Sequence, residues 1–175
     1  MPLPLSDPRW NELLGSYGDT EDIVAMLGDA YEHGGFSEGL LGDLINEIQH
    51  QDGTSTAMYA VAPHLIALAR QTSREEAFDL LINAGLIYAS SRYPKAVECP
   101  GFLKLEFEGS SNEGLESLAR LVGLGRSFDS FKYAAAAMAG FLGHHEFARF
   151  LDGLDYFDGQ FHHMLLDEPF PPEAE

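Results

Sequence analysis

The sequence predicts an all-α protein of about eight short, antiparallel helices that form either a bundle or a short solenoid. Apolar residues recur at steps of three and four along most of the 175-residue chain, which is the spacing of one helical face. Capping residues and glycines separate these segments. Clean alternation is confined to 103–107, and two-residue hairpin signals are absent, so we expect no sheet.

The N-terminal part of the chain predicts two helices. Asp7 followed by Pro8 is typical of an N-cap with proline at the first helical position, and this helix is expected to end at Leu14. Thr20 is expected to cap the second helix, whose first turn carries two carboxylates at the positive end of the helix dipole. The glycines at 34–35 end this second helix.

A third and a fourth helix follow. The third is expected to be capped by Ser37 and to end at Ile48, and the turn 50–54 comes directly after it. The last residue of that turn, a threonine, is expected to cap the fourth helix. Pro63 lies inside the fourth helix and predicts a kink or a break near 59–62.

The next two helices begin at clear signals. Residues 73–76 form a capping box, and the small residues around Gly85 predict that a neighbouring helix approaches closely. Pro100 is expected to open a helix that extends to Val122. A break in this helix is possible at 109–112, because Gly-Ser-Ser-Asn is poor helix material.

Two helices and a tail are expected at the C-terminal end. Ser127 caps a helix that runs to Phe141, and a last helix covers 147–154. The chain then becomes acidic and rich in proline. We therefore expect a single all-α domain over 1–166 and a flexible acidic tail over 167–175.

One part of the chain resembles bacterial HEAT-like helical repeat proteins. The resemblance is carried by Ile48-Gln49-His50-Gln51-Asp52-Gly53-Thr54 and by Tyr59-Ala60-Val61-Ala62-Pro63-His64-Leu65. In that family a helix ends in a His-Gln-Gly-Thr-type turn, and the next helix carries small residues before a proline. Asp52 is an insertion in this pattern, and the resemblance extends loosely over 37–154.

The resemblance implies a HEAT-like α-solenoid that binds another macromolecule, and some such proteins resemble toxin-neutralising immunity proteins. In the turn, His50, Gly53 and Thr54 are expected to have a structural role. The His50 ring would hydrogen-bond the start of the following helix and fix the angle between the two helices. Contact with a partner is the alternative role for His50.

The negative charge is concentrated at the two ends of the chain. The net charge is −10 over 1–69, −1 over 70–149 and −7 over 150–175, which together make −18. Such ends repel nucleic acid and anionic membranes and attract basic proteins. We therefore expect a basic protein partner, and neither nucleic acid nor a membrane; the sequence does not indicate an oligomeric state.

The leading hypothesis is a non-catalytic, acidic protein-binding module, in particular an immunity or inhibitor protein that covers a basic surface of a toxin or nuclease. Aromatic residues near the carboxylates suit interface anchors. The predicted partner-binding residues are Asp19, Glu21, Asp22, Asp29, Tyr31, Glu32, Tyr59, Asp155, Tyr156 and Asp158.

Two other functions stay open. A HEAT-like scaffold or regulatory subunit would bind its partner through an apolar groove, with little dependence on salt. A small-molecule enzyme would use a pocket near His50, Tyr59 and His64. That function requires a buried polar pocket and a shifted pKa.

No motif predicts a catalytic residue, a metal or a cofactor. The seven histidines include no helical pair with the spacing of metal ligands. Cys99 is flanked by Glu98, whose charge opposes thiolate formation, so a buried or capping thiol is expected.

The composition predicts a soluble, cytoplasmic protein of bacterial type. One cysteine cannot form an internal disulfide, and the start of the chain lacks the pattern of a signal peptide. The longest apolar run, near 133–142, is well short of the ~20 residues that span a bilayer.

Overall fold

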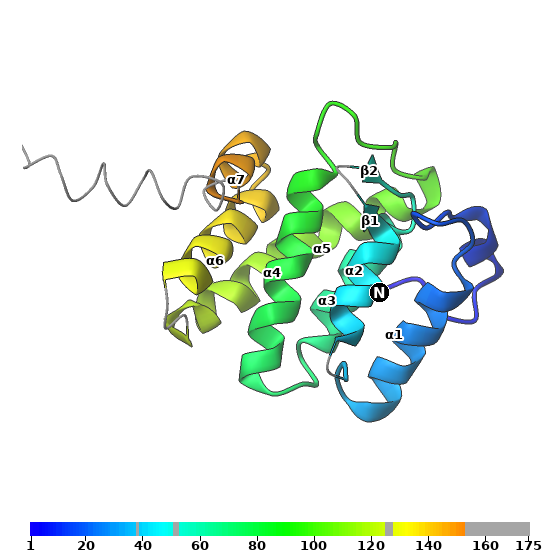
Figure 1. Ribbon diagram of the computed structural model, residues 1–175, viewed down its shortest axis with the longest axis horizontal. Coiled ribbons are helices and arrows are strands. Elements are labelled where there is room, and N and C mark those ends of the chain that lie inside the picture. The colour runs from blue at the N-terminus through cyan, green and yellow to red at the C-terminus, as the bar shows by residue number, and fades with distance from the viewer. Residues whose placement is uncertain (38, 51–52, 125–127, 153–175) are drawn as a thin grey trace, which may run out of the picture.

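The computed structural model describes residues 1–37, 39–50, 53–124 and 128–152, and within these ranges the protein is mostly helical, as predicted (Figure 1). Its α-helices are α1 (Glu21–His33), α2 (Leu40–Ile48), α3 (Met58–Leu68), α4 (Arg74–Ser90), α5 (Gly101–Leu121), α6 (Phe128–Phe141) and α7 (His145–Asp152). The other elements are the 3₁₀ helices η1 (Pro8–Glu12) and η2 (Val122–Leu124) and the strands β1 (Gln49–His50) and β2 (Gly53–Thr54).

Helices α3 and α4 form the centre of the protein. Every residue of α3 except Ala67 is buried, and α4 packs against α3, α5, α6 and α7. A helix that is apolar on all sides is stable when neighbouring elements cover all of them. Helix α1 lies on one side of this central pair, and α6 and α7 lie on the other (Figure 1).

Pro63 does not break α3, which runs without interruption from Met58 to Leu68. Of the predicted kink or break near 59–62, the break is therefore wrong. Proline removes one backbone hydrogen bond, but Pro63 is buried like its neighbours in α3, and α3 packs against α4 and α5. Burial of the apolar side chains of α3 on these neighbours outweighs the local cost.

Two of the predicted caps are present. The Asp7 carboxylate accepts a hydrogen bond from the backbone N–H of Arg9 at the start of η1, across 2.9 Å. The Ser73 hydroxyl accepts one from the backbone N–H of Glu76 at the start of α4. The Glu76 carboxylate does not return to Ser73; it accepts a hydrogen bond from the backbone N–H of Phe36 and joins α4 to the segment before α2.

Thr20 stands at the N-cap position of α1 as predicted but makes no side-chain capping bond, and the cap predicted at Ser37 is wrong. The Thr20 hydroxyl donates to the carbonyl oxygen of Trp10 across 2.9 Å and makes no capping bond to α1. Helix α2 is preceded by Gly39 and not capped by Ser37; the φ of 85° at Gly39 is a conformation that favours glycine. The Thr20 hydroxyl therefore stabilises the packing of η1 on α1 rather than the end of a helix.

A short antiparallel ladder, which the sequence did not indicate, follows α2. Gln49 pairs with Thr54 and His50 pairs with Gly53. The Thr54 hydroxyl accepts a hydrogen bond from the backbone N–H of Val97 across 2.9 Å, so Thr54 does not cap α3 as expected. This bond ties the ladder to the loop that leads into α5.

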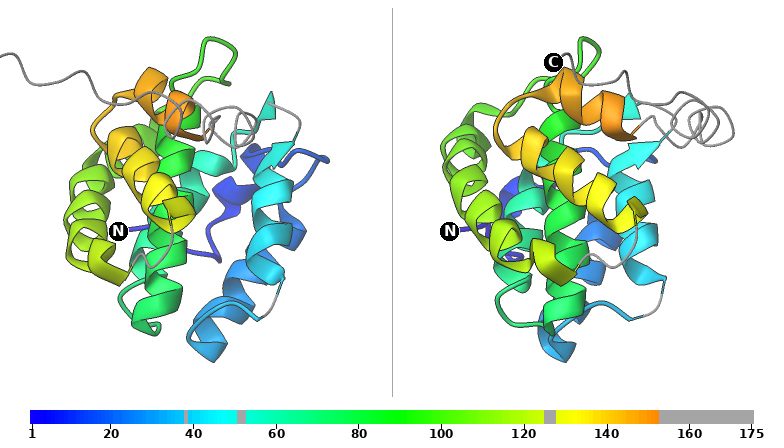
Figure 2. Two further views of the ribbon diagram at one scale, coloured as in Figure 1. Left: turned by 60° about the vertical axis from the view of Figure 1, so that its left-hand side comes forward. Right: turned by 90° about the vertical axis from the view of Figure 1, so that its left-hand side faces the viewer.

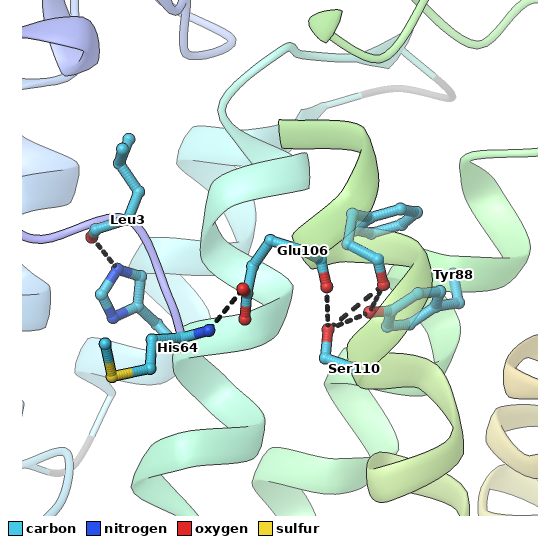
Figure 3. Close-up of polar contacts among 7 residues, drawn as sticks. Leu3, His64, Tyr88, Glu106 and Ser110 are labelled. Carbon is cyan, nitrogen blue, oxygen red and sulfur yellow. Dashed lines mark hydrogen bonds and ion pairs between the residues drawn. The ribbon is translucent and has the colours of Figure 1, made fainter. Parts of the chain in front are cut away.

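Helix α5 is continuous through 109–112, where a break was possible. The Ser110 hydroxyl donates to the carbonyl oxygen of Glu106 within the helix and lies 2.7 Å from the Tyr88 hydroxyl of α4 (Figure 3). At Gly114 a side chain would meet the Phe141 ring of α6. Polar and small residues in this stretch thus support packing between helices.

The small residues around Gly85 do admit a neighbouring helix, as the sequence predicts. A Cβ atom at Gly85 would overlap the backbone of Ala137 in α6, and one at Gly140 would overlap the carbonyl oxygen of Gly85. The backbones of α4 and α6 therefore meet directly at these two glycines.

Some expectations fall on residues outside the described ranges. These are the cap at Ser127, the end of the domain at 166 and the tail 167–175. Helices α6 and α7 occupy the positions predicted for the last two helices. Among the described residues, no helix combines the length and the apolar character that crossing a membrane requires.

Candidate functional site

Helix α1 presents an acidic face. Four exposed carboxylates belong to it: Glu21, Asp22, Asp29 and Glu32. At about 100° of rotation per residue, these positions fall within an arc of about 100°. The buried residues of the helix, Ile23, Leu27 and Ala30, lie on the opposite side and hold it against the core. The spacing of the apolar residues thus turns the carboxylates toward solvent.

These carboxylates are largely free of basic neighbours within the described part of the chain. The exception is Asp29, which lies 3.2 Å from the exposed His33 ring; hydrogen bonding to the Asp29 carbonyl and the nearby carboxylate raise the pKa of His33. Asp19, just before α1, is exposed and accepts from the backbone N–H of Glu21. Arg9, the base in this half, pairs with Asp7.

The bases of the middle segment are arranged differently. Arg70 pairs with Glu113, and Arg120 pairs with Glu116 one turn away. Charge in this segment is therefore partly neutralised within the protein. The acidic face of α1, defined here as Asp19, Glu21, Asp22, Asp29 and Glu32, keeps its charge available to a partner.

Two of the three tyrosines predicted as anchors, Tyr31 and Tyr59, belong to the described residues, and both make contacts inside the protein. Tyr59 is only 3% exposed, and its hydroxyl donates to the carbonyl oxygen of Val97 across 2.6 Å. The prediction of an exposed anchor at Tyr59 is therefore wrong, because its ring packs in the core against Phe107. Tyr31 is half-buried, and its hydroxyl bonds the ring of His64.

The remaining predicted residues divide into two groups. Asp155, Tyr156 and Asp158 lie outside the described residues. His50 and Gly53 pair in the β1–β2 ladder, whose tie to the loop before α5 is made by Thr54.

The side chains of His64 and Tyr59 bond different segments of the chain. The His64 ring is buried, and its Nε2–H donates to the carbonyl oxygen of Leu3 across 2.8 Å (Figure 3). Tyr59 instead reaches the loop at Val97. Burial lowers the pKa of His64 to about 4, so its ring is neutral near pH 7. These contacts do not join the two side chains, and a small-molecule enzyme with a pocket near His50, Tyr59 and His64 stays a prediction.

A groove of about 660 Å³ lies between α2, α4 and α6. Its apolar surface comes from Leu41 and Ile45 of α2, Phe78 and Ile82 of α4, and Tyr133 of α6. Phe78 and Ile82 are buried and form the floor, whereas Leu41 and Ile45 are partly exposed on one wall. Figure 2 (right) faces α6, with α4 behind it and α2 beside it. A volume of this size is within the usual range of binding clefts.

The rim of this groove is polar and acidic. Asp79, Asn83 and Asn46 line it, and the Asn83 amide donates to the carbonyl oxygen of Asp79 across 2.9 Å. Partial burial, together with Glu76 and Glu75, raises the pKa of Asp79. Within the described ranges, no basic side chain forms an ion pair with the Asp79 carboxylate. Among the described residues, the groove therefore combines an apolar floor with a carboxylate that has no basic partner.

A second pocket, of about 340 Å³, surrounds the thiol of Cys99. Lys104 and Arg92 line it together with Glu98 and Glu108, and no histidine does. Burial, with a contribution from Glu108, raises the pKa of Cys99 to about 11. The thiolate is therefore a minor species near neutral pH, and the group is poorly suited to nucleophilic chemistry.

Within the described residues, no group of three or more His, Cys, Asp or Glu side chains is arranged to hold a metal ion. No protein-family model, curated protein or solved structure matches the chain.

The sequence indicated the acidic face but not the groove. Its signal is the single carboxylate of Asp79 inside the apolar run Ala77-Phe78-Asp79-Leu80-Leu81-Ile82. Such a residue marks a place where an apolar helix reaches solvent. On α2, Leu41 and Ile45 have core-like spacing and gave no indication that they line a groove.

Proposed function

We propose that this protein is a non-catalytic, acidic binding module that covers a basic surface of another protein. The specific form of the proposal is an immunity or inhibitor protein that neutralises a toxin or nuclease. The observation that carries it is the acidic face of α1, whose carboxylates are exposed and lack Lys or Arg partners among the described residues.

The rigid placement of these charges supports the proposal. Helix α1 is anchored by Ile23, Leu27 and Ala30, so its outer carboxylates are held in a fixed pattern before a partner arrives. A nuclease site that holds phosphate is basic and would meet this pattern. Electrostatic steering of this kind raises association rates by roughly tenfold to a thousandfold.

A second candidate function is a scaffold or regulatory subunit that binds through an apolar groove. The groove between α2, α4 and α6 favours it. The burial of α3 on all sides and the packing of α4 against four helices support a bundle over a solenoid. The HEAT-like resemblance of 37–154, with the solenoid arrangement and the macromolecular partner that it implies, stays a prediction.

Affinity capture tests the proposal. The full chain is immobilised, lysate of the source organism is passed over it at low and at high salt, and retained proteins are identified by mass. We expect one dominant basic protein that is retained more strongly at low salt. Retention of the same protein equally at both salts would favour the scaffold function, and absence of a basic protein would contradict the proposal.

A matched pair of variants ties the result to α1. The test variant carries Glu21→Gln, Asp22→Asn, Asp29→Asn and Glu32→Gln. The control variant removes four exposed carboxylates from other elements: Glu98→Gln, Glu108→Gln, Glu116→Gln and Glu146→Gln. Both variants lose four charges, so we expect association to slow about tenfold or more in the test variant and much less in the control. Equal slowing would show that net charge, and not the face, is responsible.

A further inference from the structure

The groove between α2, α4 and α6 has two features that together limit what it can hold. Its floor and walls are apolar, from Phe78 and Ile82 to Leu41 and Ile45. Its rim carries the Asp79 carboxylate, which has no basic partner in the described ranges. An occupant that satisfies both features needs apolar side chains and a cation at one edge.

The charges around the groove make it unfavourable for acidic chains. Glu75 and Glu76 belong to the same turns of α4 as Asp79 and raise its pKa. The base in the first turn of that helix is Arg74. On the α6 side, the Lys132 ammonium lies 4.4 Å from the centre of the Tyr133 ring, and Lys132 itself is 3% exposed. Among the described residues, the exposed charge next to the opening is therefore mostly negative.

The shape of the groove points to a helix as its occupant. Residues of α2 line one side of it, residues of α4 form its floor, and Tyr133 of α6 lines the other side, so it lies between helices. Gly42 lines α2 here, and a Cβ atom built on it would meet nothing within 4 Å. Amphipathic helices bind such channels by laying one apolar face onto the floor.

We propose that this groove receives an amphipathic helix of a basic protein partner, with a lysine or arginine of that helix paired to Asp79. The inference rests on the proposed function, since it assigns the apolar part of the same partner's contact. The acidic face of α1 then accelerates the encounter, and the groove supplies the contact that slows dissociation.

The test uses two synthetic helical peptides of about 18 residues with leucines on one face. One peptide has lysines on the other face, and a control peptide of the same length has glutamates there. Binding to the full chain is measured by fluorescence anisotropy, and the contact surface is mapped by amide chemical shifts. We expect the lysine peptide to bind and to shift the amide signals of 41–46 and 78–83. The glutamate peptide should bind at least tenfold more weakly.

Two groove variants sharpen the test. Asp79→Asn removes one exposed charge with little change in shape and should weaken the lysine peptide about threefold to tenfold. Ile45→Asn replaces a partly exposed apolar wall residue and should weaken it about tenfold. In the α1 variant with four substituted carboxylates, association of the lysine peptide should be slower, and the same amides should shift. Circular dichroism confirms that each variant is folded.

Several results would overturn the inference. They are failure of the lysine peptide to bind, amide shifts confined to α1, equal binding of the glutamate peptide, and unchanged affinity for the lysine peptide in both groove variants. The proposed function is judged separately by lysate capture: a basic partner lost on changing α1 but not on changing the groove would leave that function standing without the groove. Groove binding of the peptide without any basic partner from lysate would instead contradict the proposed function.

Discussion

The hydroxyl of Tyr31 donates a hydrogen bond to Nδ1 of His64 across 3.0 Å and joins α1 to α3. The direction follows from the other ring nitrogen, Nε2, which lies 2.8 Å from the carbonyl oxygen of Leu3 and must carry the proton. Trp10 and Tyr31 enclose the ring. The neutral histidine thus holds the N-terminal segment and α1 against the core helix α3.

Acidification should destabilise the protein through His64. Its pKa is lowered by burial to about 4 in the folded state, against 6.5 when exposed, so the unfolded chain binds the proton more readily. The stabilisation is complete above about pH 6.5 and is lost as the pH falls toward 4, by up to about 3 kcal/mol. Urea unfolding at several pH values between these limits measures the slope.

The titration of the ring itself provides the control. By NMR, the His64 ring protons should stay at their neutral positions down to about pH 5, whereas the exposed His33, whose pKa is raised, should titrate at higher pH. A His64 midpoint at or above that of His33 would contradict the role assigned to burial.

A methyl group at the contact of α4 and α6 should be strongly destabilising. In Gly85→Ala or Gly140→Ala, the new Cβ would overlap backbone atoms of the facing helix, so the two helices must separate. We expect each substitution to lower the free energy of unfolding by about 1–3 kcal/mol or more. Chemical denaturation measures the change.

Gly42→Ala is the matched control, because nothing lies within 4 Å of a Cβ at that position. The same substitution in an open helical site should stabilise the protein by about 0.5–1 kcal/mol. A similar loss of stability at all three glycines would contradict the packing argument.

The helices could be predicted from the sequence because their signals are local. Ile23, Leu27 and Ala30 recur at steps of four and three residues, with exposed carboxylates on the other face, and this pattern predicts α1 without any knowledge of its neighbours. The same holds for the cap at Ser73, whose hydroxyl bonds a backbone group three residues away. The acidic face of α1 follows directly from these local patterns.

Contacts between distant segments could not be predicted. The Thr54 hydroxyl bonds Val97, so the ladder depends on a residue that no local pattern connects to it. The groove escaped prediction for a related reason: Ile45 has the same helical spacing as the buried Leu44 and Ile48 nearby. Periodicity identifies an apolar face but does not show whether a neighbour covers it. Burial of Tyr59 was missed likewise.

The Tyr88 hydroxyl should contribute measurably to stability. It donates to the carbonyl oxygen of Phe107 and lies 2.7 Å from the Ser110 hydroxyl, while its ring stacks on Phe107. Tyr88→Phe keeps the ring and removes the buried hydrogen bonds of its hydroxyl to these two oxygens, which should cost about 1–2 kcal/mol. Thermal and urea unfolding measure the loss.

Ser111→Ala is the control for this prediction. It removes an exposed hydroxyl from the next position of α5 and should change stability by less than about 0.5 kcal/mol. Equal losses of stability from the two substitutions would show that the buried hydrogen bonds of Tyr88 contribute no more than an exposed hydroxyl does.

The thiol of Cys99 should react slowly in the folded protein. Burial and the charge of Glu108 raise its pKa to about 11, compared with 9.0 for an exposed thiol, and alkylation requires the thiolate. At about pH 8 the thiolate fraction, and with it the rate of reaction with iodoacetamide, should be roughly a hundredfold lower than in the urea-unfolded chain. Mass spectrometry of timed samples gives both rates.

Two variants test the role of Glu108. In Glu108→Gln the rate in the folded protein should rise, because one of the charges that oppose the thiolate is gone. Glu116→Gln changes a carboxylate outside this pocket and should leave the rate unchanged. Rapid labelling of the folded wild-type protein would reopen a nucleophilic role for this pocket.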